Sequence, residues 1–187
     1  MVKVCIFLAD GFEEVEALTV VDLLRRAKID ITTVSITGKP EVTGRSRICI
    51  SADALFENMC FGNMDMLILP GGMPGTTALG SFSPLCTLLK AHAAKGKYIA
   101  AICAAPSILG RLEILSGKKA TSYPGFEQDM IGCEYLTQPT VCLLYTSFKE
   151  TEPAFFLSII FVYLQTLYNS EAIQAQQFRW GHSFVWR

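Results

Sequence analysis

The chain has 187 residues, a formal net charge of −1 and 51% hydrophobic residues. A chain of this length can bury roughly 70% of its unfolded surface, so a single core is possible without disulfide or metal staples. The balanced charge favours neither nucleic acid nor an anionic membrane as a partner. The seven cysteines contain no CxxC pair, which excludes a typical zinc-site spacing and fits the reducing cytoplasm.

Short apolar runs alternate with amphipathic segments along the first 115 residues. The pattern predicts strands at 2–8, 30–36, 64–69 and 98–102, a hairpin or edge strand at 41–50, and helices at 13–28, 84–95 and 106–115. This alternation predicts an α/β fold with a mostly parallel sheet and helices on both faces. Ligands in such folds bind at the carboxyl ends of the strands.

The most apolar segment lies near the C-terminus, at residues 154–167. It is shorter than the about 20 apolar residues that a membrane span needs. We therefore expect a buried helix over 154–177 that packs on the same domain, and no membrane partner. The apolar start of the chain is too short for a signal sequence and is predicted to be the first strand.

Cys103 stands where the predicted strand 98–102 turns sharply into a helix, and Pro106 suits the first turn of that helix. Such a turn presents a side chain at the carboxyl edge of the sheet, and the helix N-terminus stabilises a nucleophilic thiolate. The alternative is a buried cysteine that acts as a small hydrophobe. We expect that role for the other six: Cys5, Cys49, Cys60, Cys86, Cys133 and Cys142.

Two further strand ends carry unusual residues, at 10–16 and at 70–75, and both are expected to meet Cys103 at one edge of the sheet. The apolar stripe of the first helix continues backwards through Glu13 and Glu16. A carboxylate on a core-facing stripe needs a partner. We expect a protonated Glu16 to donate to a Cys103 thiolate. The alternative is that these carboxylates, including Glu14, only complement the helix N-terminus, which we expect for Glu14.

The glycine pair Gly71 and Gly72 lets the backbone approach a ligand closely. The N–H groups of Gly72 and Ala104 could form an oxyanion hole beside Cys103, and a plain tight turn is the alternative. The two histidines of the chain, His92 and His182, lie in segments not expected to reach this edge. A Cys-His protease or amidotransferase mechanism is therefore not favoured.

Three motifs taken together resemble the ThiJ/PfpI superfamily and its DJ-one branch: LADGFEEVEAL (8–18), ILPGGMPG (68–75) and AAICAAP (100–106). The resemblance covers residues 1–141 and implies a flavodoxin-like three-layer sandwich that forms homodimers. It implies that Cys103 is the reactive cysteine, that Glu16 hydrogen-bonds it, and that Gly71, Gly72 and Ala104 supply surrounding backbone. The protease-like branch carries histidine where this chain has Ala104.

The sequence departs from this pattern in two places. Tyr123 stands where some relatives place a histidine, and with Glu13 it is a candidate contact for a substrate. The segment CLLYTS (142–147) replaces the usual glycine-rich turn, which sets 142–187 apart as an atypical C-terminal segment. One reading frame of a common transposon-end sequencing adapter encodes this hexapeptide, so we hypothesise that it is not native. A divergent strand is the alternative, and the codons of the underlying DNA distinguish the two.

The resemblance implies a cofactor-independent glyoxalase or deglycase that acts on small aldehydes and reactive dicarbonyls, with no metal. It also implies an alternative, a redox sensor or holdase chaperone that works through oxidation of Cys103. The same residues serve both functions, so the sequence leaves the choice open.

Overall fold

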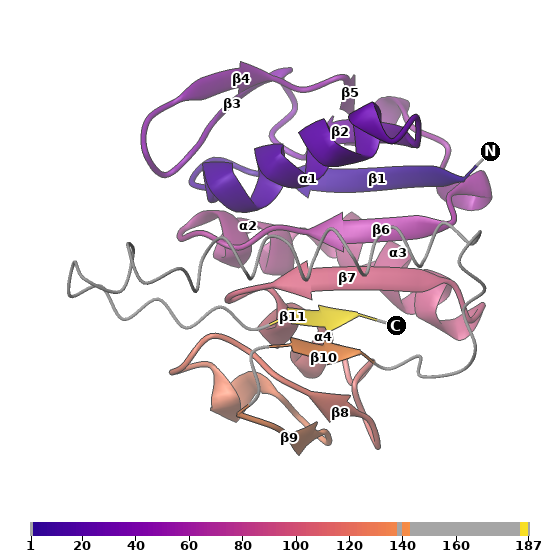
Figure 1. The fold of residues 1–187 in the computed structure, drawn as a ribbon, viewed down its shortest axis with the longest axis vertical. Coiled ribbons are helices and arrows are strands. Elements are labelled where there is room, and N and C mark those ends of the chain that lie inside the picture. Colours follow the sequence, from indigo (N-terminus) through magenta and orange to yellow (C-terminus); the bar gives the residue numbers. More distant parts are fainter. Residues whose placement is uncertain (1, 138–139, 143–183, 187) are drawn as a thin grey trace.

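The computed structural model describes residues 2–137, 140–142 and 184–186. Its centre is a seven-stranded sheet in the order β10-β11-β7-β6-β1-β2-β5 (Figure 1). The strands are β1 (Lys3–Leu8), β2 (Asp30–Ser35), β5 (Ala54–Leu55), β6 (Met66–Leu69), β7 (Tyr98–Ile102), β10 (Thr140–Cys142) and β11 (Phe184–Trp186). The five strands from β7 to β5 are mutually parallel, whereas β11 runs antiparallel to β7.

Helices cover both faces of this sheet. The helix α1 (Glu14–Arg26) lies on one face, and α2 (Gly75–Ser81), α3 (Ser83–Ala94) and α4 (Pro106–Arg111) lie on the other (Figure 1). The order β2-β1-β6-β7 is that of flavodoxin-like sheets, in which the strand order reverses direction between β1 and β6. The predicted three-layer, flavodoxin-like α/β fold is confirmed.

Alternate residues of each central strand enter two separate cores, because successive side chains of a strand point to opposite faces. Towards α1, the sheet buries Val4, Ile6, Leu8, Met66, Ile68, Ala100 and Ile102. Towards α2, α3 and α4, it buries Cys5, Phe7, Ala9, Leu67, Leu69, Ile99 and Ala101. Both faces are apolar, which explains why these strands appear in the sequence as continuous hydrophobic runs.

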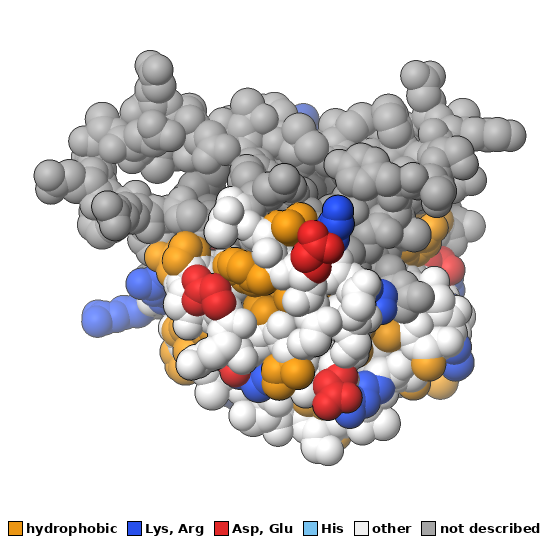
Figure 2. All heavy atoms as spheres, turned by 90° about the horizontal axis from the view of Figure 1, so that it is seen from below, with side chains coloured by type: hydrophobic (Ala, Val, Ile, Leu, Met, Phe, Trp, Pro, Cys, Tyr) orange, Lys and Arg blue, Asp and Glu red, His pale blue; other side chains and the backbone are white. Residues whose placement is uncertain are grey.

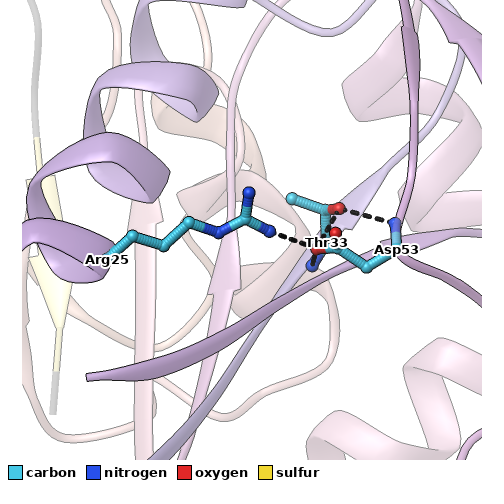
Figure 3. Close-up of polar contacts among 3 residues, drawn as sticks. All are labelled: Arg25, Thr33 and Asp53. Carbon is cyan, nitrogen blue, oxygen red and sulfur yellow. Dashed lines mark hydrogen bonds and ion pairs between the residues drawn. The ribbon is translucent and has the colours of Figure 1, made fainter. Parts of the chain in front are cut away.

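The helix α1 follows the predicted stripe, with Ala17, Val20, Val21 and Leu24 buried against the sheet. Arg25, in its last turn, forms an ion pair with Asp53, whose carboxylate also accepts hydrogen bonds from the backbone N–H and hydroxyl of Thr33 (Figure 3). This cluster joins α1 to β2 and to the turn before β5.

The predicted hairpin is present as a separate two-stranded sheet, β3 (Glu41–Thr43) paired antiparallel with β4 (Cys49–Ser51). A second small sheet pairs β8 (Lys119–Ala120) with β9 (Glu134–Tyr135) in parallel. Figure 2 views the molecule from this second end, where apolar, acidic and basic side chains are interspersed among the described residues. The described part of that face therefore carries no single-sign patch of the kind that binds nucleic acid.

Two features differ from the sequence-based expectation. The helix predicted at 106–115 ends at Arg111, because Leu112 leaves helical geometry and Glu113 adopts a positive φ of 60°. The helix α2, the short strands β5, β8 and β9, and the strand β11 were not predicted, since segments of two to seven residues carry little periodicity. The expected helix 154–177 lies outside the described residues. None of the helices in the described part of the chain is both long and apolar enough to span a membrane.

Candidate active site

Three strand ends meet at the carboxyl edge of the sheet, at the reversal point between β1 and β6. The Glu13 N–H donates to the Gly71 carbonyl (2.9 Å), and the Gly75 N–H donates to the Gly11 carbonyl (3.3 Å). The residue Gly72 has a φ of 93°, and a Cβ there would collide with the backbone of Glu13. The two loops after β1 and β6 are thus closely packed beside Cys103, and the predicted convergence is confirmed.

Cys103 occupies a sharp turn between β7 and α4. Its φ of 61° is a left-handed conformation that non-glycine residues rarely adopt. The Tyr123 N–H holds this turn by donating to the Cys103 carbonyl (2.7 Å). The side chain is partly exposed, and the backbone N–H groups of Ala104 and Gly72 hydrogen-bond the sulfur. The predicted strand-turn-helix elbow is present, and backbone donors surround its thiol.

Glu16 projects from the first turn of α1 into this site and is only 4% exposed. Its Oε2 accepts the Gly71 N–H (2.8 Å), and its carboxyl also hydrogen-bonds the Cys103 side chain. Burial raises the pKa of Glu16 to about 8, because a charged carboxylate is costly away from water, and the nearby charge of Glu13 adds to this effect. At neutral pH, Glu16 is therefore mostly protonated, as the sequence led us to expect.

The charge on the sulfur is governed by opposing effects. Burial raises the pKa of the Cys103 thiol, and an ionised Glu16 raises it further. The N–H groups of Ala104 and Gly72 lower it, since they donate to the sulfur. Two adjacent anions are unfavourable in this setting, so the pair carries at most one negative charge near neutral pH. The net effect raises the pKa of Cys103 well above its usual value and above that of Glu16, so the structure does not favour the thiolate that the sequence led us to expect at neutral pH, and the pair is neutral there.

Gly71 allows the two reactive side chains to approach each other. A Cβ at this position would lie 2.5 Å from Glu16 Oε2, 2.6 Å from Cys103 Cβ and 3.2 Å from Cys103 Sγ. Any larger residue would therefore displace the carboxyl or the thiol. The conformation of Gly71 needs no positive φ, so the requirement for glycine here is spatial.

Glu13 and Glu14 differ from their sequence-based expectations. Glu13 precedes α1 and forms an ion pair with Arg45 of the hairpin (3.3 Å), instead of continuing the buried stripe. Glu14 was expected only to complement the helix N-terminus, yet it is buried and its Oε1 accepts the Ser46 N–H (2.7 Å). The spacing 14, 17, 21, 24 is a buried-face pattern and could have revealed Glu14. No local signal identified Arg45, because its partner is 32 residues away.

The remaining candidate residues occupy clear positions. Tyr123 is half-buried and contacts Cys103 through its backbone, whereas a role for its ring towards a substrate stays a prediction. His92 is buried in α3 and hydrogen-bonds the backbone at Asp65 and Tyr98, at the amino ends of β6 and β7. It therefore lies at the edge opposite Cys103. His182 is outside the described residues, and within the described residues no three metal-ligating side chains gather.

The fold and the site at the carboxyl edge of the sheet define a class of protein. It is a flavodoxin-like domain in which a cysteine at a strand-to-helix elbow, Cys103, contacts a buried carboxyl, Glu16. The profile of the DJ-1/PfpI family matches residues 2–161. The chain belongs to this family, as the resemblance to the ThiJ/PfpI superfamily predicted. The match continues past residue 141, and the division of the chain at that residue stays a prediction.

Individual relatives agree with this assignment. The chain is 35% identical to Protein dj-1beta of Drosophila melanogaster over 73% of each chain. It is 32% identical to a protein named as a deglycase from Pyrococcus abyssi, over 69% of this chain and 76% of the relative. It is 37% identical to Protein DJ-1 homolog B of Arabidopsis thaliana, of which it spans 30%.

Solved structures agree as well. The crystal structure of Drosophila melanogaster DJ-1beta has a TM-score of 0.70 at 30% identity, and 94% of this chain and 95% of that one are covered. The oxidised DJ-1 of Toxoplasma gondii has a TM-score of 0.68 at 30% identity, with the same coverage.

Proposed function

We propose that this chain is a small cytoplasmic stress enzyme that converts reactive dicarbonyls such as methylglyoxal, in the manner of a glyoxalase or deglycase. The observation that carries the proposal is the hydrogen bond between the Glu16 carboxyl and the Cys103 thiol, with Gly71 anchoring the carboxyl. A nucleophile within hydrogen-bond reach of a proton carrier whose pKa lies near neutral pH is the arrangement that carbonyl addition needs. The deglycase name of the archaeal relative supports the same substrate class.

The first step is the addition of sulfur to the aldehyde. The Cys103 sulfur forms a bond to the aldehyde carbon, and the carbonyl electrons move to oxygen, which takes up a proton from the Glu16–Cys103 pair. We expect the Ala104 and Gly72 N–H groups, which hydrogen-bond the resting sulfur, to stabilise the oxyanion as it develops. The product of this step is a hemithioacetal on Cys103.

The second step is an internal redox change that needs no cofactor. The ionised Glu16 takes the proton from the former aldehyde carbon and returns it to the adjacent ketone carbon. The hydroxyl proton of the first carbon passes to the ketone oxygen through an enediol, so the first carbon is oxidised to a thioester and the second is reduced to an alcohol, and protons and electrons balance within the substrate. Water then cleaves the thioester, which releases a 2-hydroxy acid and restores the thiol. For methylglyoxal the product is lactate.

Lactate formation from methylglyoxal tests this proposal in the wild type, Cys103→Ser and Glu16→Gln. We expect lactate from the wild type and a loss of at least about 100-fold in both variants, a typical cost of removing a proton carrier or nucleophile. Cys5→Ser is the matched control, because Cys5 is buried in the other core and should leave the rate unchanged. Equal rates in the wild type and Cys103→Ser would refute the proposal.

A second candidate function is a redox sensor. It is supported by the partial exposure of Cys103 and by the protonated state of Glu16, which could donate a hydrogen bond to a sulfinate oxygen. Selective conversion of Cys103 to sulfinate by mild peroxide, followed by mass spectrometry, tests it. A holdase chaperone activity stays a prediction from family resemblance.

We also propose that the protein acts as a homodimer. Val15 on α1 and Ile48, which precedes β4, are 52% and 53% exposed. In sequence they adjoin Glu14 and Ser46, whose hydrogen bond joins α1 to the turn of the hairpin. Exposed apolar side chains on adjoining elements favour a protein contact at that position.

A further inference from the structure

The β3–β4 hairpin is attached directly to the loop that forms one side of the active site. Asp10 Oδ1 accepts the Thr43 N–H (2.9 Å), and Glu14 Oε1 accepts the Ser46 N–H (2.7 Å). Two backbone bonds run alongside, from the Gly11 N–H to the Thr43 carbonyl and from the Arg45 N–H to the Phe12 carbonyl, both 2.8 Å. The hairpin also buries Val42 in the core on the α1 side of the sheet, with Ile50 packed against that core, so these polar contacts fix its turn beside the loop after β1.

Glu13 connects this hairpin to the reactive pair. Its carboxylate forms an ion pair with Arg45 (3.3 Å), while its backbone N–H donates to the Gly71 carbonyl (2.9 Å). The N–H of the same Gly71 donates to Glu16, which hydrogen-bonds Cys103. A continuous path of polar contacts therefore runs from Arg45 to the sulfur.

Charged groups approach Glu16 from each element packed against it. Glu13 caps the same helix three residues earlier, Arg45 comes from the hairpin, and Cys103 comes from the elbow. Glu13 raises the pKa of Glu16, and Arg45 lowers it. The Glu13 side chain is 17% exposed, so its charge is poorly screened by solvent and depends on Arg45 for compensation.

We propose that the Glu13–Arg45 ion pair is a positioning unit that makes the reactivity of Cys103 depend on the placement of the β3–β4 hairpin. With the hairpin docked, the Arg45 cation offsets the Glu13 anion, and the Glu16–Cys103 pair can carry a negative charge. With the hairpin displaced, Glu13 alone faces the pair and disfavours that charge. This regulation rests on the proposed role of Cys103 as the nucleophile.

The test measures sulfur reactivity and needs no substrate turnover. The rate of alkylation of Cys103 by iodoacetamide is followed by peptide mass spectrometry from pH 5.5 to 10. Removing one charge that lies several ångströms from the Glu16–Cys103 pair should move the midpoint of this pH profile by on the order of half a pH unit. We expect Glu13→Gln to shift it to lower pH, Arg45→Met to shift it to higher pH, and the double variant to return close to the wild-type value.

Arg45→Lys should restore most of the wild-type midpoint, because it retains the charge. The matched control is Arg25→Met, since the Arg25 side chain has the same exposure of 49% and also forms an ion pair with a carboxylate, that of Asp53, but in the last turn of α1 (Figure 3). It should leave the midpoint unchanged. Alkylation of the fully buried Cys5, measured in the same digest, reports any general unfolding.

Opposite shifts with compensation in the double variant support the inference, because loss of structure would move both single variants in the same direction. Shifts of the same sign, the absence of shifts, or an equal shift in Arg25→Met would overturn it. An unreactive Cys103 in the wild type would instead overturn the proposed function, so the two failures are distinguishable.

Discussion

The Glu16 carboxyl and the Cys103 thiol share a hydrogen bond, although they come from residues 87 positions apart in the chain and from opposite sides of the β6 strand end. Their contact exists because β1 and β7 flank β6 in the sheet, which brings α1 and the elbow to either side of Gly71. The two groups exchange protons as a unit, so chemistry at the sulfur and ionisation of the carboxyl are inseparable.

Substitution of Gly71 by alanine should reduce activity strongly. The new methyl group would lie 2.5 Å from Glu16 Oε2 and 2.6 Å from Cys103 Cβ, so one of the two must move. We expect a loss of lactate formation of more than about 10-fold, and a fall of about 1–3 kcal/mol in the free energy of unfolding from overpacking. Urea denaturation and the lactate assay measure both.

Gly62→Ala is the control for this substitution. A Cβ at Gly62 meets no atom within 4 Å, and its φ is not in the left-handed region. This variant should match the wild type in both assays. Full activity of Gly71→Ala would show that the close contact of Glu16 with Cys103 is not needed.

The stability of the wild type should fall as the pH rises through the range in which Glu16 ionises. Since the folded-state pKa of Glu16 is raised from 4.5 to about 8, the unfolded chain releases this proton more readily than the folded one. The stabilisation from the buried neutral acid is complete below pH 4.5 and is lost progressively towards pH 8, by on the order of a few kcal/mol. Urea denaturation at pH 5, 6.5 and 8 measures this loss.

Glu16→Gln should lack this loss of stability with rising pH, because an amide stays neutral at every pH tested. Cys103→Ala should retain it, since burial and not the sulfur is the main cause of the raised pKa of Glu16. If the wild type and Glu16→Gln lose stability in parallel, the carboxyl is already ionised in the folded protein.

His92 should make the protein sensitive to acid. Burial lowers the pKa of its imidazole, whose Nε2 has no hydrogen-bond partner within the described structure. Protonation therefore favours the unfolded chain, and stability should be lost as the pH falls below about 6.5. His92→Asn can still donate to the neighbouring backbone and should reduce this loss, as measured by thermal unfolding at pH 5 and 7.5. If thermal stability differs between pH 5 and pH 7.5 as much in His92→Asn as in the wild type, His92 is not the source of the acid sensitivity.

The proposed dimer should depend on the apolar side chains of Val15 and Ile48. Glutamate at either position would bury a charge in the contact, which is costly without a partner. We expect the dissociation constant from sedimentation equilibrium to rise at least about 10-fold. Ile131→Glu is the control, because Ile131 is similarly exposed at 47% but lies between η3 (Glu127–Asp129) and β9. An equal effect of all three substitutions would exclude a specific contact.

The sequence predicted the central strands, the elbow and the convergence of three strand ends because each leaves a local pattern. Apolar runs with flanking glycine and proline locate β1, β6 and β7, and the stripe of α1 placed Glu16 on a buried face. The role of the hairpin could not be predicted in this way. Arg45 and Ser46 contact Glu13 and Glu14 across 32 residues, and no local pattern encodes that pairing.

The left-handed backbone of Cys103 has a consequence for redesign of this site. The turn is held by the Tyr123 N–H and by the packing of β7 and α4, and none of these contacts involves the sulfur. The scaffold would therefore present a serine or a selenocysteine at position 103 to the same carboxyl and the same backbone donors. The chemistry of this edge is separable from its architecture, so exchange of one side chain changes the nucleophile without rebuilding the pocket that activates it.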